Sequence, residues 1–185
     1  MDPPESFPSR VIPAAALIHQ EGALGVIALV GLYLRQPGII GGLAPRGPVV
    51  TAVLLGIGIG LASSLILWLI RGLAPLASLE RWQREMVRGW TVTDAVTVAV
   101  FSGLAEEALI RALLQPLIGL VPAAAIFAVL HLVPDRRLWL WPILALVLGL
   151  VLGVAFELAG YPAAAAAHLI INGFALVRLR TLPAD

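Results

Sequence analysis

The chain has 185 residues, of which 60% are hydrophobic and 12% are charged, with a mean hydropathy of +0.98. Soluble domains are about 45–50% apolar and about 25% charged, so this composition excludes an ordinary soluble domain and indicates a membrane protein. The net charge of +1 favours no nucleic-acid partner, and the lack of Cys excludes disulfides, thiolate nucleophiles and thiolate metal ligands.

The chain opens with "MDPPESFPSR", which has none of the features of a cleaved signal peptide, so we expect no such signal. Apolar segments then follow, and those near 20 residues are long enough to cross the hydrocarbon core of a bilayer. We therefore expect an all-α polytopic membrane protein, with about six transmembrane segments in a single membrane domain, 1–185. The segments are roughly 12–34, 49–70, 92–118, 122–133, 138–157 and 161–178.

The link 71–90 mixes Leu, Trp and Met with Arg and Glu at near-helical spacing, which predicts an amphipathic helix in the membrane interface. The Arg residues near the segment ends predict that both termini are cytoplasmic. All twelve basic residues are Arg, which suggests a GC-rich bacterial genome and a location in the bacterial cytoplasmic (inner) membrane. The predicted cytoplasmic side carries Arg10, Arg71, Arg81, Arg84, Arg88, Arg136, Arg137, Arg178 and Arg180, against Arg35 and Arg46 on the other side.

The third segment contains "FSGLAEEALIRALLQPLIGL", in which Glu106, Glu107 and Arg111 interrupt an apolar helix. An ionised side chain at the bilayer centre costs ~2.5–3.5 kcal/mol on insertion scales, so these groups must face a cavity or one another. Glu107 and Arg111 are four residues apart, which favours an ion pair. Glu106 is rotated from Glu107 by about 100° on the helix and is left as the free carboxylate. On spacing alone, one structural cluster of all three remains an alternative.

Three more polar side chains lie well inside apolar segments. His131 follows Phe127 by one turn in "IFAVLHLV", and His168 and Asn172 share a helix face in "AHLIINGF". Counting residues along the helices places Glu106, His131 and His168 at similar depths, nearer the side opposite to the Arg-rich one. This set suits a hydrolase, in which Glu106 is a general base on water. One His would share the water or protonate the leaving amine, while the other and Asn172 would stabilise an oxyanion.

The motifs "EEALIR", "FAVLH" and "HLIIN" are similar to the EExxxR, FxxxH and HxxxN motifs of the CPBP family. This family contains the type II CAAX prenyl proteases, bacteriocin-processing proteins and abortive-infection proteins. The resemblance covers about 90–175 and implies a four-helix catalytic core, for which we expect the boundaries 90–178.

The resemblance implies a glutamic intramembrane endopeptidase that needs no metal or other cofactor. Its partners would be the lipid bilayer and a peptide or membrane-protein substrate. Glu106 would activate water with the help of His131, and His168 and Asn172 would form the oxyanion site. The supporting residues would be Glu107, Arg111 and Phe127.

Three other functions remain open. A zinc protease would take Glu106, His131 and His168 as ligands, although the sequence contains no HExxH. A serine protease of the rhomboid kind would use Ser102, which precedes Gly103. A transporter or proton relay would use the buried Glu and His for ion movement instead of peptide hydrolysis.

Overall fold

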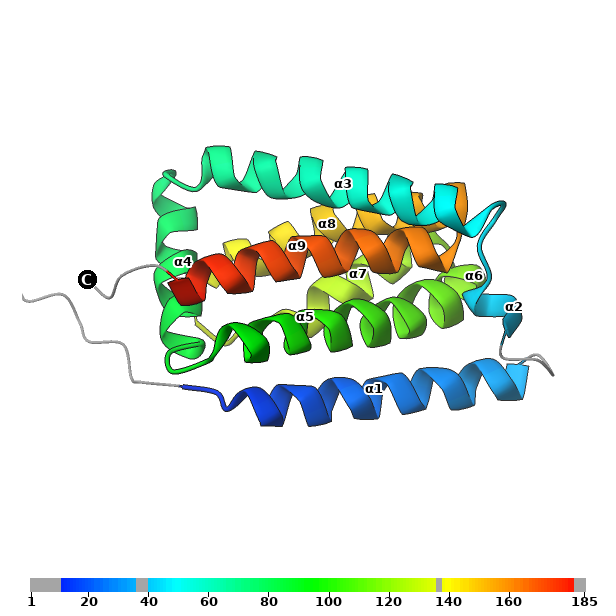
Figure 1. Cartoon of the computed structure of the whole chain (residues 1–185), viewed down its shortest axis with the longest axis horizontal. Helices are drawn as coiled ribbons and strands as arrows, with labels where there is room; N and C mark the ends of the chain where they lie inside the picture. The colour runs from blue at the N-terminus through cyan, green and yellow to red at the C-terminus, as the bar shows by residue number, and fades with distance from the viewer. Residues whose placement is uncertain (1–10, 36–39, 136–137, 182–185) are drawn as a thin grey trace, which may run out of the picture.

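The computed structural model describes residues 11–35, 40–135 and 138–181. Within these ranges the chain forms helices, with one isolated bridge between Pro45 and Gly160 and no strand. The long helices lie side by side in one bundle, and a shorter helix crosses one end of it (Figure 1). The predicted all-α polytopic membrane fold is confirmed. The segment 1–10, Arg136 and Arg137, which entered the predictions of signal and orientation, lie outside the described residues.

In the part of the chain that the structure describes, four helices are long and apolar enough to cross a membrane: α1, α3, α8 and α9. The run from α5 through the π-helix η1 to α6 is continuous but changes helix type on the way. In chain order the elements are α1 (Ala14–Arg35), α2 (Ile40–Leu43), α3 (Val49–Ile70), α4 (Ala74–Met86), α5 (Val92–Glu107), η1 (Ala108–Leu114), α6 (Gln115–Ile118), α7 (Leu120–Leu130), α8 (Leu140–Ala159) and α9 (Tyr161–Thr181).

The fourth predicted segment differs most from the structure. The expected range 122–133 is replaced by α7, which begins at Leu120, directly after Gly119, and ends at Leu130. Gly119 has φ +89°, a backbone conformation that favours glycine, and it separates α6 from α7. The 11 residues of α7 span only about 16 Å at 1.5 Å per residue, which is shorter than a ~30 Å hydrocarbon core. His131 therefore caps the end of a short helix instead of lying within a long one.

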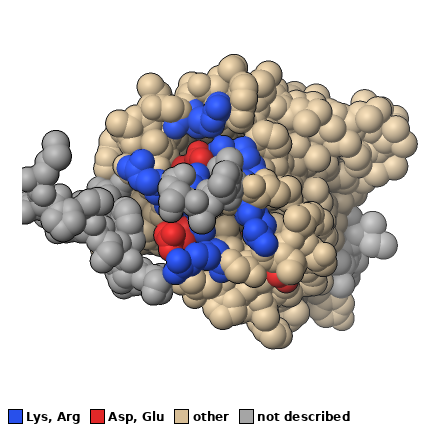
Figure 2. Space-filling view, turned by 60° about the vertical axis from the view of Figure 1, so that its left-hand side comes forward, with Lys and Arg blue, Asp and Glu red and all other residues tan. Residues whose placement is uncertain are grey.

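The helix α4 lies across one end of the bundle, where the C-terminal end of α9 also lies (Figure 1). Leu79 is its buried residue, and Glu80 pairs with Arg84 at 3.7 Å and with Arg178 of α9 at 2.5 Å. Trp82 packs edge-on against Trp141 at the start of α8. Figure 2 shows basic side chains gathered at this end of the molecule. The amphipathic helix predicted for 71–90 is present and carries charges at an end of the bundle.

The contact between α3 and α9 is made by small residues. The buried residues of α3 are Ala52, Gly56, Gly60 and Ser64, spaced four apart on one face. A Cβ added to Gly60 would lie 2.8 Å from the backbone oxygen of Ala167 in α9. Small residues at such spacing let two membrane helices approach closely enough for their backbones to touch. This contact holds α9, the helix that carries His168 and Asn172, against the bundle.

The helix α5 begins with a capping box, in which the side chains of Thr91 and Asp94 each bond the other's backbone N–H. Further along, a Cβ added to Gly103 would lie 3.0 Å from the backbone nitrogen of Leu169 in α9. This close approach of α5 and α9 brings the polar residues of both helices together.

Candidate active site

Glu107 lies at the centre of the polar cluster between α5 and α9. Its side chain is fully buried, and its Oε2 accepts a hydrogen bond from Nε of Arg111 at 3.1 Å. Its Oε1 lies 2.8 Å from Nδ1 of His168, which is 61 residues away in the sequence. Glu107 thus forms the expected pair with Arg111. It also forms a second bond, to His168, which the helical spacing did not predict.

His168 and Asn172 continue this network. Nδ2 of Asn172 lies 2.9 Å from Nε2 of His168 and 2.9 Å from Oγ of Ser102. The ring of His168 therefore donates through Nδ1 to Glu107 and accepts through Nε2 from Asn172 when it is neutral. Both amide hydrogens of Asn172 are then engaged, so it can donate to another group only when one of these bonds breaks.

His131 is held by the helix that it caps. Its Nδ1 lies 2.8 Å from the backbone oxygen of Phe127. A carbonyl oxygen only accepts, so Nδ1 carries a hydrogen and Nε2 of the neutral ring is an acceptor. The ring of Phe127 contacts both imidazoles, with centroids 4.6 Å from His131 and 5.8 Å from His168, and the guanidinium of Arg111 lies over it.

Glu106 stands apart from these hydrogen bonds. The residue is half-buried, and its Oε2 is buried with no hydrogen-bond partner among the described residues. It lies within electrostatic range of His131, His168 and Glu107. The structure therefore brings all four predicted catalytic residues into one region, with Glu106 as the carboxylate whose oxygen remains free.

A cavity of about 190 Å³ reaches this region from the end of the bundle where α4 lies. Its walls are mostly apolar side chains of α3, α8 and α9, and Glu106 is not among its lining residues. The sequence predicted that the site lies nearer the side of the membrane opposite to the Arg-rich side. The cavity instead connects the site with the Arg-rich end of the bundle. The polar and aromatic lining residues include Phe127, His131, His168 and Asn172 at the inner end, and Trp68, Arg71, Glu80, Gln83 and Arg178 near α4.

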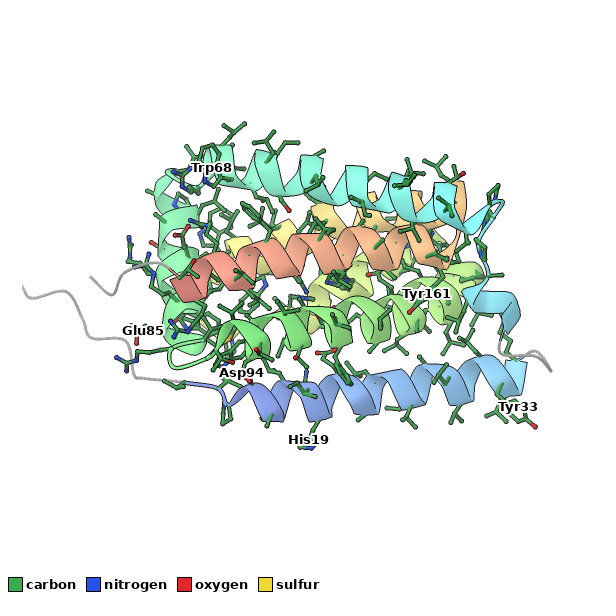
Figure 3. All side chains as sticks on the ribbon, viewed as in Figure 1. His19, Tyr33, Trp68, Glu85, Asp94 and Tyr161 are labelled. Carbon is green, nitrogen blue, oxygen red and sulfur yellow. The ribbon has the colours of Figure 1, made fainter. Side chains whose placement is uncertain are left out.

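The remaining polar groups near the site have other partners. The described residues contain no group of three His, Cys, Asp or Glu side chains placed to hold a metal ion. Tyr161 (Figure 3) donates a hydrogen bond to the backbone oxygen of Leu104, two residues before Glu106 in α5. His19, the third His of the chain, is exposed and points away from the bundle (Figure 3).

Two residues at this site were not among the predicted site residues. Ser102, considered only as a nucleophile, is buried and hydrogen-bonded to Asn172. Glu21 of α1 is 5% exposed and interacts electrostatically with His168. The sequence did contain a signal for Glu21, because "HQE" at 19–21 interrupts an otherwise apolar segment.

The fold and the site define a class of protein: a polytopic membrane protein with ionisable side chains clustered between its helices. Residues 88–174 match the model of a family described as type II CAAX prenyl endopeptidase Rce1-like. The CPBP resemblance is thereby confirmed over these residues. The family indicates a protease that acts in a membrane on a peptide or membrane-protein substrate. No curated protein and no solved structure matches the chain.

Proposed function

We propose that this protein is a glutamic intramembrane endopeptidase in which Glu106 activates the attacking water. The observation that carries the proposal is the free, buried Oε2 of Glu106 beside two imidazoles whose Nδ1 atoms are already engaged. The catalytic core extends over 90–178, and the reaction needs no metal or other cofactor. A bacterial cytoplasmic membrane is the proposed location.

In the attack, Glu106 accepts a proton from water as the water oxygen bonds to the peptide carbonyl carbon. Nε2 of His131 accepts the second hydrogen of the water and so orients it, because the bond from Nδ1 to Phe127 leaves Nε2 free. When the tetrahedral intermediate collapses, the C–N bond breaks and Glu106 returns its proton to the leaving amine. The products are a free carboxyl group and a free amine.

The negative oxygen of the intermediate is stabilised by His168 and Asn172. In the reacting form His168 carries both ring protons, and the carboxylate of Glu107 balances the charge through its 2.8 Å contact with Nδ1. A protonated Nε2 no longer accepts from Asn172, so both residues can donate to the oxyanion from the wall of the cavity. Each such donor typically contributes ~3–4 kcal/mol to the transition state.

The cavity suits a chain of apolar side chains, because its walls are apolar while its two ends are polar. A peptide that enters from the α4 end would bring its backbone to His131 and His168. The test therefore includes a peptide that carries a prenyl group and one that does not.

The protein in nanodiscs is incubated with a farnesylated peptide, its unmodified counterpart and a membrane-spanning peptide, and products are identified by mass spectrometry. We expect cleavage of at least one peptide by the wild type, in the presence or absence of a chelator, and none by Glu106→Gln. Glu85→Gln, which changes a partly exposed acid of α4 that pairs with Arg88 and does not line the cavity, is the matched control and should cleave normally. Cleavage of no peptide, or cleavage retained by Glu106→Gln, contradicts the proposal. Activity lost with the chelator and restored by zinc would favour a zinc protease.

A further inference from the structure

Glu21 is a buried acid outside the segment that matches the family. It lies in α1, is 5% exposed, and its Oε2 has no hydrogen-bond partner among the described residues. Buried polar atoms in native proteins almost always have a partner, so each exception needs a physical reason. An acid at this depth of an apolar helix is expected to serve the function of the protein.

The packing of α1 shows which part of α5 Glu21 faces. The two helices run side by side in the same direction (Figure 1). A Cβ added to Gly25 would lie 3.5 Å from Cβ of Ala105, and one added to Gly31 would meet the side chain of Leu113. Glu21 is one turn before Gly25 on the same helix face, so it faces α5 about one turn before Ala105. This is the level of Ser102, which accepts a hydrogen bond from Asn172 of the polar network, and Glu106 lies one turn further along α5.

Some of the charged groups around Glu21 are bonded to each other, and others interact with Glu21 itself. From α5 and α9, Glu106 and His168 interact electrostatically with Glu21. Glu107 and Arg111, the other charged groups of this region, bond to each other and so compensate each other. Glu21 and Glu106 are thus two neighbouring acids, each with a buried Oε2 that has no partner among the described residues.

We propose that Glu21 is a positioning residue of the active site, which shares a single proton with Glu106 across the α1–α5 interface. Two nearby carboxylates in a low dielectric do not both ionise readily, and their protons leave in coupled steps. This inference rests on the proposed function, in which His168 is protonated. With one shared proton, the acid pair carries one negative charge and Glu107, which contacts both cations, carries the other, so that together they balance His168 and Arg111. The whole cluster is then neutral, as a site inside a bilayer requires.

The consequence for the reaction is that Glu21 acts through Glu106. The negative charge that Glu21 adds to the acid pair makes the carboxylate of Glu106 a stronger acceptor for the proton of the water. Replacing Glu21 should therefore change turnover and the pH dependence of Glu106, while substrate affinity stays the same.

The test is a pH titration of the full chain in nanodiscs, with no substrate, in which infrared difference spectra follow the protonated carboxyl groups. In Glu21→Gln the midpoint of the remaining carboxyl group should move to lower pH by about one unit or more, since the neighbouring acid is gone. Glu106→Gln should move the midpoint of Glu21 in the same way. Glu85→Gln, the control in α4, should leave both unchanged.

A second measurement separates this role from a purely structural one. On a peptide that the wild type cleaves, Glu21→Gln should lower kcat about tenfold with KM unchanged, and Glu21→Asp, which keeps the carboxyl group, should recover part of the loss. Glu21→Asp also preserves the test if Glu21→Gln fails to fold, because its two acids should still titrate in coupled steps. An unchanged Glu106 midpoint in Glu21→Gln, or independent titration of the two acids in Glu21→Asp, overturns the proposal. The titration uses no substrate, so that failure is distinct from a failure to cleave any peptide.

Discussion

The helix α9 makes two contacts of opposite kinds. Toward α3 it presents Ala167 and neighbouring small residues, and the backbones come so close that no side chain larger than that of Gly60 fits. Toward α5 it presents His168 and Asn172, which form hydrogen bonds with Glu107 and Ser102. In a bilayer, close packing supplies most of the attraction between helices, while an interhelical hydrogen bond contributes only ~0.6 kcal/mol on average. One face of α9 therefore holds the helix in place, and the other face is available for chemistry.

The strongest test of this division is Glu106→Gln, which removes the proposed base from the polar side. We expect kcat to fall by ~10²–10⁴, the usual contribution of a general base. The melting temperature in detergent should stay near that of the wild type, because Glu106 Oε2 makes no hydrogen bond with the described residues that would be lost. A large fall in melting temperature with little change in kcat would contradict the division.

Glu107→Gln is the one polar substitution for which we expect a large loss of stability. It removes a buried negative charge that compensates Arg111 and orients His168. Breaking a buried ion pair on one side typically costs 3–5 kcal/mol, because the partner charge remains buried. Thermal unfolding and kcat should both be affected, whereas Glu106→Gln affects kcat alone. A melting temperature equal to that of the wild type would show that Arg111 finds another partner.

Asn172→Ala removes a proposed oxyanion donor from α9. We expect kcat to fall by ~10²–10³ with little change in KM, since the lost bond forms only in the transition state. Asn172→Asp should be at least as damaging, because a carboxylate repels the developing negative charge. If Asn172 serves only to join the helices, its removal would lower the melting temperature slightly and leave kcat intact.

Gly60→Leu tests the opposite face of α9. Its Cβ alone would lie 2.7 Å from Cβ of Ile170, so a larger side chain must push α3 away from α9. Overpacking of this kind costs about 1–3 kcal/mol. The melting temperature should fall, while kcat of the folded fraction changes little. Gly58→Leu is the matched control, because a Cβ at Gly58 meets no atom within 4 Å.

Ser102→Ala should have the smallest effect. Ser102 is buried and accepts one hydrogen bond from Asn172, so its loss should cost only ~0.6 kcal/mol. We expect kcat within a few-fold of the wild type in the same peptide assay. Complete loss of cleavage would instead indicate that Ser102 is the nucleophile of a serine protease.

Apolar length and helical spacing were enough to predict the main helices and the polar residues of the site. The predicted range 49–70 coincides with α3, and the i, i+4 spacing anticipated the bond between Glu107 and Arg111. The bond from Glu107 to His168 could not be predicted, because periodicity shows which way a residue faces on its own helix and not which residue of another helix it meets. Glu21 was not predicted as a site residue for the same reason, because the packing of α1 on α5 determines which residues it meets.

The π-helix η1 determines how the two halves of the run 92–118 are rotated relative to each other. Its hydrogen bonds reach one residue further than those of an α-helix, so it holds one residue more than an α-helical path would need. Beyond it, Nε2 of Gln115 donates to the backbone oxygen of Gly153 at 3.1 Å, fastening this run to α8. Deleting one residue within 108–114 would let the segment relax into an α-helix without turning Gln115 away from Gly153. Deleting one residue within α5 would instead rotate every later side chain by about 100°. A related chain that lacks one residue in η1 can therefore keep Glu106, Glu107 and the anchor to α8 in their places.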